Sequence, residues 1–370
     1  MKKAYILSTS FFDFESMKPT IGGMQSYFLD LVPILESNGY ETVITSECCD
    51  EKLVKMPTYS VLGIQLKGKK YSFILSKAIK TILKPGDLVI YGTDSLINKK
   101  IIFDKAVAIQ HGVSWDIPVL NKNRRVLRML FPRFLNFYKI VKRLSYVKNI
   151  VCVDYNFVNW YRTLVDDTSG TITIIPNYCK IPRKKLGEPS STIKIIFARR
   201  LCWYRGTRIF LEAILPILQE FDNVAVTIAG EGPDEQFLTS NLNTFKNVDF
   251  IKYSSDESVT IHSNYDIAVV PTIGSEGTSL SLLEAMAAQC AVVSSDVGGL
   301  TNILINNHNG LIVGSNNSSE LYLAIRRLIV DKDLRDKLSI NGYKTVCDSF
   351  SFERWSEDWD CLLKKMEGKE

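Results

Sequence analysis

The sequence of 370 residues lacks the features that mark membrane-spanning, disulfide-bonded or zinc-binding proteins. It has no uninterrupted run of about 18 apolar residues, so we expect no transmembrane helix. Its eight cysteines form no C-x-x-C spacing and its three histidines have no nearby ligand set, so we expect reduced thiols and no metal site. The opening stretch MKKAYILSTSFFDFE has only a short apolar run before two acidic residues, and we interpret it as a first strand rather than a signal peptide.

Charge is distributed unevenly along the chain. Residues 1–190 carry 28 Lys and Arg against 16 Asp and Glu, whereas residues 191–370 carry 17 against 24. Much of the basic excess lies in residues 122–148, which contain nine basic side chains and no acidic one, interleaved with apolar residues. This basic segment suits an anionic membrane surface, although a solvated helix face would have the same pattern. No nucleic-acid recognition module accompanies it, so we expect no nucleic-acid partner.

Short β-branched runs alternate with longer helical patterns, which predicts α/β domains with parallel sheets. Six strands are expected in each half of the chain. They are residues 4–10, 41–46, 87–92, 106–112, 149–153 and 171–177, then 193–198, 224–230, 248–251, 266–271, 291–295 and 310–313. The turn-rich stretch 177–192 is the best linker between the halves. We therefore expect an N-terminal domain over 1–180, a second domain over 181–345 and a C-terminal helix over 346–370.

Two glutamates in the second half stand in an unusual context. Glu276 lies in a loop after an expected strand, and Glu284 lies in the apolar helix that follows, where an unpartnered carboxylate would be costly. If the whole interval were helical, the two would be offset by roughly 12 Å along the axis, whereas the carboxylates of a glycosidase lie about 5 to 9.5 Å apart. The spacing therefore suits two ends of one extended ligand better than a hydrolytic pair.

The helix start between these glutamates is a candidate anion site, because unpaired amides and the helix dipole favour a phosphate there. The amides belong to Gly277, Thr278, Ser279 and Leu280. Hydroxyl groups of a ribose would give Glu284 the partners that it otherwise lacks. Arg200 and Arg205 follow the expected strand 193–198 and could stabilise negative charge on a leaving group without a metal ion.

Weaker signals lie in the first half. Gly22 and Gly23 precede a helix and would let backbone amides approach a phosphate, although a tight turn would have the same pattern. His111 stands at the carboxyl end of an expected strand, where ligands bind in open α/β sheets, although a structural histidine bonded to a backbone carbonyl is the alternative. Asp116 is a weaker candidate, and Glu47, after the second strand, could serve a ribose.

The frame S-E-G-x-S-L-x-L-L-E-A-M-A around the two glutamates resembles the signature of glycosyltransferase family 4, whose members are retaining enzymes of the GT-B fold. Other motifs match in order. FARRLCWYRG resembles G-R-L-x-x-x-K-G, AGEGPD resembles the strand-end G-x-G-P turn and includes Gly230, IPNY resembles P-N-G, NHNGLIV resembles D-G-x-N-G-L-L-V, and IGGMQSY resembles the glycine loop near the donor phosphates. Three departures stand out: Arg205 replaces a lysine, Asn302 a carboxylate and Tyr178 a glycine.

The resemblance implies two Rossmann-like domains that face each other across a cleft, with the C-terminal helix crossing back to the N-terminal domain. The domain over 1–180 would bind the acceptor, and the domain over 181–345 would bind the nucleotide-sugar. It implies transfer of a sugar from a UDP- or GDP-linked donor to an acceptor hydroxyl, with retention of configuration and without a metal ion or other cofactor. Arg200, Arg205 and the four amides would hold the diphosphate. Glu284 would hold the ribose, and Glu276 and His111 would orient the sugar.

We expect the acceptor to be a glycan or a lipid-linked intermediate, as in the building of a bacterial surface polysaccharide. The protein would be cytoplasmic or peripheral at the inner face of the plasma membrane, held there by residues 122–148. Two alternatives stay open: a nucleotide-sugar epimerase of GT-B architecture, and a carbohydrate-binding protein with a dead active site.

Overall fold

A computed structural model describes residues 1–20, 22–66, 70–113, 117, 134–163, 165, 171–181, 191–254, 257–274 and 276–368. The described residues form two compact units. Unit 1 takes those within Met1–His111, Lys122–Ile175 and Ser356–Glu370, and unit 2 takes those within Gly112–Asn121 and Pro176–Trp355. The predicted boundaries after residues 180 and 345 lie close to these divisions, and the roles assigned to the predicted domains stay predictions.

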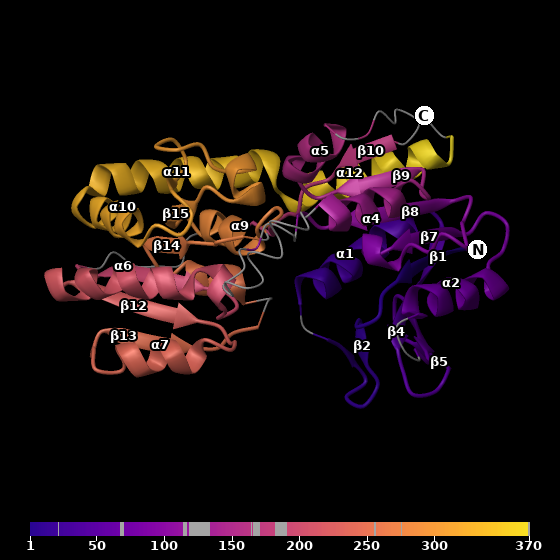
Figure 1. The fold of residues 1–370 in the computed structure, drawn as a ribbon, viewed down its shortest axis with the longest axis horizontal. Helices are drawn as coiled ribbons and strands as arrows, with labels where there is room; N and C mark the ends of the chain where they lie inside the picture. The colour runs from indigo at the N-terminus through magenta and orange to yellow at the C-terminus, as the bar shows by residue number, and fades with distance from the viewer. Residues whose placement is uncertain are drawn as a thin grey trace. The chain divides into compact units, whose positions relative to one another are not determined.

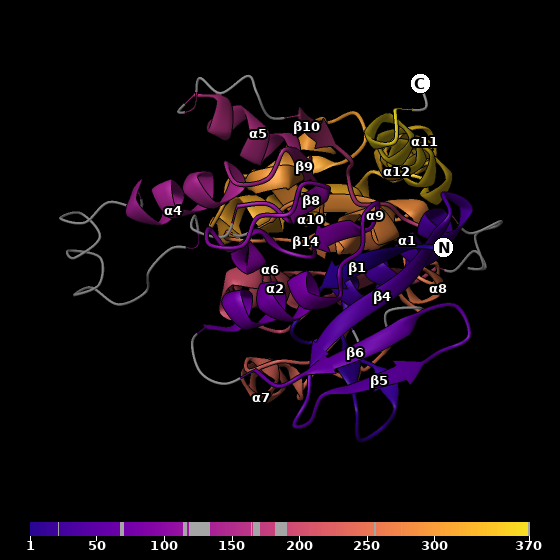
Figure 2. The ribbon, with the colours of Figure 1, turned by 90° about the vertical axis from the view of Figure 1, so that its right-hand side faces the viewer.

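Unit 1 is built on an eight-stranded sheet of order β10-β9-β8-β7-β1-β4-β6-β5, with every neighbouring pair parallel except β5 with β6. Figure 2 shows β4, β6 and β5 side by side at one edge. The strands are β1 (Lys2–Leu7), β4 (Tyr40–Glu47), β5 (Lys52–Lys55), β6 (Ser60–Ile64), β7 (Leu88–Tyr91), β8 (Ala106–Gln110), β9 (Asn149–Cys152) and β10 (Thr171–Ile174). A separate hairpin pairs β2 (Phe12–Asp13) with β3 (Lys18–Pro19). The helices are α1 (Gly23–Ser37), α2 (Tyr71–Ile82), η2 (Asp94–Leu96), α4 (Phe134–Leu144) and α5 (Tyr155–Arg162).

The central strands of unit 1 are buried throughout. Every residue of β7 and β8 is buried, without the alternation expected of a sheet with one wet face. Such continuous apolar runs are typical of parallel strands covered on both faces. The carboxyl ends of β1, β4 and β7 therefore lie along one edge of the sheet, where polar loops follow.

Unit 2 has a six-stranded parallel sheet of order β13-β12-β11-β14-β15-β16. Its strands are β11 (Ile193–Ala198), β12 (Val224–Ala229), β13 (Val248–Ile251), β14 (Ile267–Val270), β15 (Ala291–Ser295) and β16 (Leu311–Val313). Its helices are η3 (Trp203–Arg205), α6 (Thr207–Glu220), α7 (Glu235–Leu242), α8 (Ser258–His262), α9 (Leu280–Ala287), η4 (Gly298–Asn302), α10 (Ser318–Val330) and α11 (Lys332–Ser349). Figure 1 shows α10 and α11 side by side.

The alternation of side chains along β11 divides the core of unit 2 between the two faces of the sheet. Ile195 and Phe197 pack with apolar residues of α6, α7 and α10. Ile196 and Ala198 pack instead with the apolar residues of α9. Successive residues of a strand point to opposite faces, so both faces are covered by helices.

The last helix, α12 (Phe352–Met366), begins in unit 2 and belongs to unit 1 from Ser356 onward. Trp355 packs against Tyr178, with ring centroids 4.3 Å apart, within unit 2. Trp359 belongs to unit 1, where its Nε1 donates a hydrogen bond of 2.8 Å to the hydroxyl of Tyr27. The tyrosine that replaces the expected glycine of the P-N-G motif is therefore a packing partner of this helix.

The predicted fold class is confirmed: the chain has two α/β units with parallel sheets and a C-terminal helix that returns to the first unit. All twelve predicted strands are present. Strands β5 and β6 were not predicted, because β5 is mostly exposed and β6 is a five-residue run interrupted by Gly63. Among the described residues, no helix is long and apolar enough to cross a membrane.

Candidate active site

Glu276 lies in the loop between β14 and α9 of unit 2 and is 5% exposed. Its carbonyl oxygen accepts a hydrogen bond of 3.0 Å from the amide of Gly299. Gly298 has a φ of +52°, and a Cβ built there would lie 2.3 Å from the same carbonyl oxygen. Only glycine fits this approach, so the V-G-G turn after β15 fixes the backbone of the glutamate loop.

Both carboxylate oxygens of Glu276 carry hydrogen bonds from cations. Arg199 Nη2 donates to Oε1 at 2.6 Å, and Arg205 Nη1 donates to Oε2. The hydroxyls of Thr272 and Ser279 also lie 3.1 and 3.2 Å from Oε1. Two guanidinium groups thus surround one carboxylate, which leaves the cluster with a net positive charge.

The charges in this cluster shift one another's ionisation. Burial alone would raise the pKa of Glu276, but the positive charges of Arg199 and Arg205 outweigh it, so this pKa lies below its ordinary value. Burial lowers the pKa of Arg199, against the opposing effect of Glu276. For Arg205 the lowering by burial is outweighed by Glu276, and its pKa is raised. Glu276 is therefore a carboxylate at neutral pH and a weak base.

The two arginines on Glu276 reach it from the segment after β11. Arg199 follows the strand directly, and Arg205 ends the short helix η3. The next residue, Gly206, has a φ of +88°, and a Cβ there would lie 1.9 Å from the carbonyl oxygen of Pro271. This close crossing places the end of η3 against the loop that carries Glu276.

The sequence singled out Arg200 rather than Arg199. The Arg200 side chain is exposed, whereas Arg199 is buried and bonded to Glu276. Arg199 occupies the glycine position of the family pattern G-R-L-x-x-x-K-G, so pattern matching passed over it. Gly230, another predicted donor-site residue, has a φ of +131°, and a Cβ there would lie 2.3 Å from the carbonyl oxygen of Arg199. Gly230 therefore packs under the residue that sequence reasoning missed.

The predicted anion site lies at the start of α9. Ser279 is its N-cap and Leu280 its first residue, and no side chain caps this helix end. The carbonyl oxygen of Thr278 accepts a hydrogen bond of 2.8 Å from Asn177 Nδ2, which ties the helix start to the segment after β10. Gly277 lies against Gly299, whose Cβ would be 2.3 Å from the Gly277 carbonyl oxygen. The four predicted residues thus form one short, fixed turn into the helix.

Glu284 lies one turn into α9 and is partly exposed. Its Oε2 accepts a hydrogen bond of 2.6 Å from the hydroxyl of Ser258. Burial raises the pKa of Glu284 to about 7, and the bond from Ser258 opposes that shift. In contrast to Glu276, this carboxyl bonds to a hydroxyl rather than to a guanidinium group, and it is half protonated near neutral pH.

The predicted site residues of unit 1 lie at the carboxyl end of its sheet. Gly22 is the N-cap of α1 and Gly23 its first residue. His111 follows β8, and its Nε2 donates a hydrogen bond of 2.8 Å to the carbonyl oxygen of Gly92. Its ring also meets Tyr27 edge-on at 5.9 Å. Burial lowers the pKa of His111 despite the bond to Gly92, so its imidazole is neutral at pH 7 and offers Nδ1 as an acceptor.

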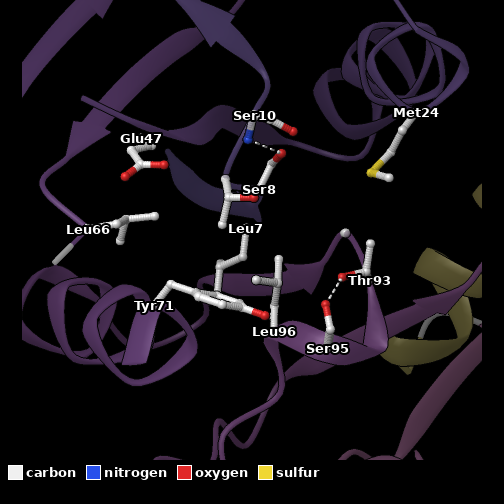
Figure 3. A pocket seen from close by; sticks show the side chains of 12 residues that line it. Leu7, Ser8, Ser10, Met24, Glu47, Leu66, Tyr71, Thr93, Ser95 and Leu96 are labelled. Carbon is white, nitrogen blue, oxygen red and sulfur yellow. Dashed lines mark hydrogen bonds between the residues drawn. The ribbon is translucent and has the colours of Figure 1, made fainter. Parts of the chain in front are cut away.

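Unit 1 also contains a cavity of about 400 Å³ that the sequence did not predict (Figure 3). It lies beyond the carboxyl ends of β1, β4 and β7. Its lining combines hydroxyl groups, apolar side chains and one carboxylate: Leu7, Ser8, Thr9, Ser10, Met24, Glu47, Leu66, Tyr71, Gly92, Thr93, Ser95 and Leu96. Thr93 and Ser95 are hydrogen-bonded to each other at 2.6 Å. Such a cavity suits a hydroxylated ligand with an apolar face.

The basic segment and Asp116, which the sequence singled out, lie wholly or partly outside the described residues. Residues 118–133, which hold the first half of the basic segment 122–148, and Asp116 lie outside the described residues. Farther along that segment, Lys142 and Lys148 are exposed. No group of three or more potential metal ligands occurs in the part of the chain that the structure describes.

The whole chain resembles two solved structures in its fold. Sucrose-phosphate synthase from Thermosynechococcus elongatus superposes with a TM-score of 0.78 at 16% identity, covering 100% of both chains. Anabaena HepE in complex with UDP-glucose superposes with a TM-score of 0.69 at 14% identity, covering 99% of this chain and 100% of the other. The fold is therefore that of the GT-B glycosyltransferases.

Sequence comparison narrows the class. Residues 180–345 match the family model described as glycosyl transferases group 1, so this segment of the chain is similar to that family. A relative from Campylobacter jejuni, N,N'-diacetylbacillosaminyl-diphospho-undecaprenol alpha-1,3-N-acetylgalactosaminyltransferase, is 31% identical over 188 residues, which cover 50% of this chain and 48% of the relative. The chain spans about half the length of several curated relatives that it matches. The resemblance found in the sequence is thus confirmed at the level of family and fold.

Proposed function

We propose that the protein is a retaining glycosyltransferase, which moves a sugar from a UDP- or GDP-linked donor to an acceptor hydroxyl without a metal ion. The observation that carries the proposal is the buried cluster of Glu276 with Arg199 and Arg205 beside the start of α9. Departure of a nucleoside diphosphate builds negative charge on its oxygens, and fixed cations stabilise that charge. The net positive cluster and the helix N-terminus supply such stabilisation in unit 2.

Each predicted residue then has a role in donor binding. Arg205 and the exposed Arg200 bind the diphosphate, together with the amides at the start of α9. Glu284 accepts hydrogen bonds from the ribose, as its partly exposed carboxyl permits. Glu276 orients the transferred sugar, and His111 of unit 1 offers its Nδ1 as an acceptor to a sugar hydroxyl.

The state of Glu276 supports retention of configuration under this proposal. Neighbouring positive charges hold the pKa of Glu276 below its ordinary value, so it is a poor nucleophile and a weak base. If the acceptor attacks the sugar on the same face from which the diphosphate departs, the reaction needs neither a protein nucleophile nor a protein base. A phosphate oxygen of the leaving group takes the acceptor proton while the new glycosidic bond forms and the sugar–oxygen bond to phosphate breaks.

We propose that the cavity of unit 1 binds the acceptor, a glycan or a lipid-linked intermediate. Its hydroxyl groups and Glu47 suit hydrogen bonding to sugar hydroxyls, and its leucines and Tyr71 suit the apolar face of a sugar ring. The Campylobacter relative is named for a polyprenyl-diphosphate-linked acceptor, which supports this class of acceptor for the present chain.

The proposal is tested by thermal stabilisation with UDP, GDP and a panel of their sugars, followed by NMR analysis of the product anomer with EDTA present. A donor present at a free concentration of 100 times its Kd stabilises the native state by about 2.7 kcal/mol. Transfer with retention in EDTA is expected. Interconversion of the donor sugar without an acceptor would identify an epimerase, and binding without any turnover would identify a carbohydrate-binding protein. Inversion of configuration would contradict the mechanism.

The two glutamates are separated by their effects. Glu284→Ala is expected to weaken binding of the nucleoside diphosphate, because the ribose loses its acceptor. Glu276→Ala is expected to lower kcat by about 100-fold, since misplacement of the sugar disrupts the attack geometry. Binding is measured by calorimetry and turnover by release of the nucleoside diphosphate. Wild-type values for both variants would contradict the assignment.

A further inference from the structure

We infer that Arg199 is a positioning residue, which holds Glu276 in one orientation while Arg205 exchanges between Glu276 and the donor. The inference rests on the proposed function, because it concerns how the sugar-orienting glutamate is held. It assigns different roles to two arginines that contact the same carboxylate.

The two arginines differ in burial. The side chain of Arg199 is 4% exposed, whereas that of Arg205 is 24% exposed. Arg205 also lies over the ring of Tyr204, with its guanidinium carbon 5.4 Å from the centroid. A solvent-accessible guanidinium can turn toward an incoming phosphate, whereas a buried one cannot leave without abandoning a buried charge.

The two carboxylate oxygens of Glu276 differ in the same way. Oε1 accepts hydrogen bonds from Arg199 and from the hydroxyls of Thr272 and Ser279, the last two at 3.1 and 3.2 Å. Oε2 accepts a hydrogen bond from Arg205. Oε1 is therefore fixed by three protein groups, and Oε2 is the oxygen that becomes available when Arg205 moves.

Arg199 itself is held on several sides. Its Nη1 donates a hydrogen bond of 2.7 Å to Thr272, so arginine, threonine and glutamate form a closed triangle. The backbone amide of Arg199 donates a hydrogen bond of 2.9 Å to the carbonyl oxygen of Ala229. Gly230 packs against the carbonyl oxygen of Arg199. The backbone of Arg199 is thus held by neighbouring residues, and two nitrogens of its guanidinium group are hydrogen-bonded, one to Thr272 and one to Glu276.

This arrangement explains how the site changes on donor binding without leaving a buried charge unpaired. Arg205 moves from Oε2 to the diphosphate, where it makes charge-assisted hydrogen bonds. Oε2 then accepts a hydrogen bond from a sugar hydroxyl. Arg199 stays and balances the charge of Glu276, so the glutamate keeps its ionisation and orientation throughout.

The inference is tested with Arg199→Gln, Arg199→Lys and Arg205→Gln, with Arg326→Gln as a control for loss of one positive charge. The side chain of Arg326, on α10, is 44% exposed and pairs with Glu220 at the end of α6. Calorimetry compares the affinity for a nucleoside diphosphate with that for its sugar, using UDP with UDP-glucose and GDP with GDP-mannose. A ¹³C NMR titration follows the Glu276 carboxyl in the free protein.

Arg199→Gln is expected to weaken diphosphate binding less than Arg205→Gln does, because Arg199 does not contact the diphosphate. It is expected to lose about tenfold or more of the added affinity for the nucleotide-sugar, the size of one hydrogen bond to a charged group. Arg205→Gln is expected to weaken both ligands. The titration of Glu276 is expected to move to higher pH in Arg199→Gln, because one opposite charge is lost. Arg199→Lys is expected to fall between, since an ammonium cannot span Thr272 and Glu276 as the guanidinium does.

A folded Arg199→Gln protein with the wild-type ratio of the two affinities and an unchanged Glu276 titration would overturn the inference. If Arg199→Gln does not fold, Arg199→Lys decides in the same way. The proposed function fails separately, if wild-type protein binds none of the nucleotides or nucleotide-sugars.

Discussion

Glu276 and Glu284 are eight residues apart, yet the protein keeps them in opposite electrostatic states. Glu276 lies between two guanidinium groups, which hold its pKa below the ordinary value. Glu284 receives a hydroxyl from Ser258, and burial raises its pKa to about 7. One carboxyl is therefore charged at neutral pH, and the other changes its charge in the neutral range.

Glu284 makes nucleotide binding dependent on pH. Hydrogen bonds from ribose hydroxyls favour the carboxylate, so binding near pH 6.5 is expected to release protons. Calorimetry in buffers of different ionisation enthalpy measures this release, and Glu284→Gln should abolish it. Proton release that persists unchanged in the variant would remove Glu284 from the ribose site.

The same group affects the stability of the free protein. A carboxyl whose pKa is raised on folding binds more protons in the native state, so its contribution falls as pH rises from about 4.5 to about 7 and is constant above that. Urea unfolding of wild type and Glu284→Gln is expected to show the difference between them growing over this window. A constant difference would contradict the raised pKa.

The sequence could indicate a cationic site after β11 but not which arginine is buried. Arg199 and Arg200 are neighbours beyond the end of a strand, where the alternation of side chains no longer sets their direction. Arg199 turns inward because Thr272 and Glu276, more than 70 residues away, bond to it. Such long-range partners leave no mark on local spacing, and the family pattern pointed to the other arginine.

At the scale of elements, the strands were predictable because continuous β-branched runs mark strands that are buried on both faces. Strand β5, at the edge of the sheet, was missed because it is mostly exposed, and β6 was missed because Gly63 interrupts its short apolar run. The cavity of unit 1 was missed for a different reason. Its lining comes from the ends of β1, β4 and β7 together with α1, α2 and η2, and only the folded sheet brings these together.

The start of α6 depends on one glycine. Gly206 has a φ of +88° and approaches the carbonyl oxygen of Pro271 too closely for any side chain. Gly206→Ala is expected to lower the free energy of unfolding by about 2 kcal/mol or more, from backbone strain and steric overlap. Chemical denaturation measures the change. Gly39→Ala is a control, because Gly39 also has a positive φ of +84° but no atom within 4 Å of a built Cβ.

The end of α12 is held to unit 1 by Glu367. This carboxylate accepts hydrogen bonds from Lys105, Lys2 and Tyr40, which lower its pKa to about 2. The stability that it contributes is present above about pH 4.5 and is lost as pH falls through about 2.

Glu367→Gln is expected to cost up to about 1 kcal/mol at pH 7, a value limited by solvent screening. The cost should shrink as the pH is lowered below 4.5. Urea titrations between pH 3 and 7 measure it, with Glu357→Gln as the control on an exposed position of the same helix. A cost that does not depend on pH would contradict the role of the charge.

At the scale of the whole molecule, the basic excess of the first half predicts binding to anionic membranes. Vesicles containing phosphatidylglycerol are expected to retain the protein at low salt and to release it as salt rises, because screening shortens the range of the attraction. Replacing Lys139, Lys142 and Lys148 by glutamine should weaken retention. The matched change of Lys246, Lys337 and Lys344 in unit 2 should not. Equal retention of both triple variants would restrict the basic segment to solubility.

The cluster of Glu276 with Arg199 and Arg205 has one further consequence under the proposed function. Every group that grips the diphosphate before transfer still grips it afterwards, because only the sugar has left. The nucleoside diphosphate product therefore competes with the donor for the same cations. Steady turnover in a cell then requires a phosphatase or another reaction that removes the nucleoside diphosphate and keeps its concentration low.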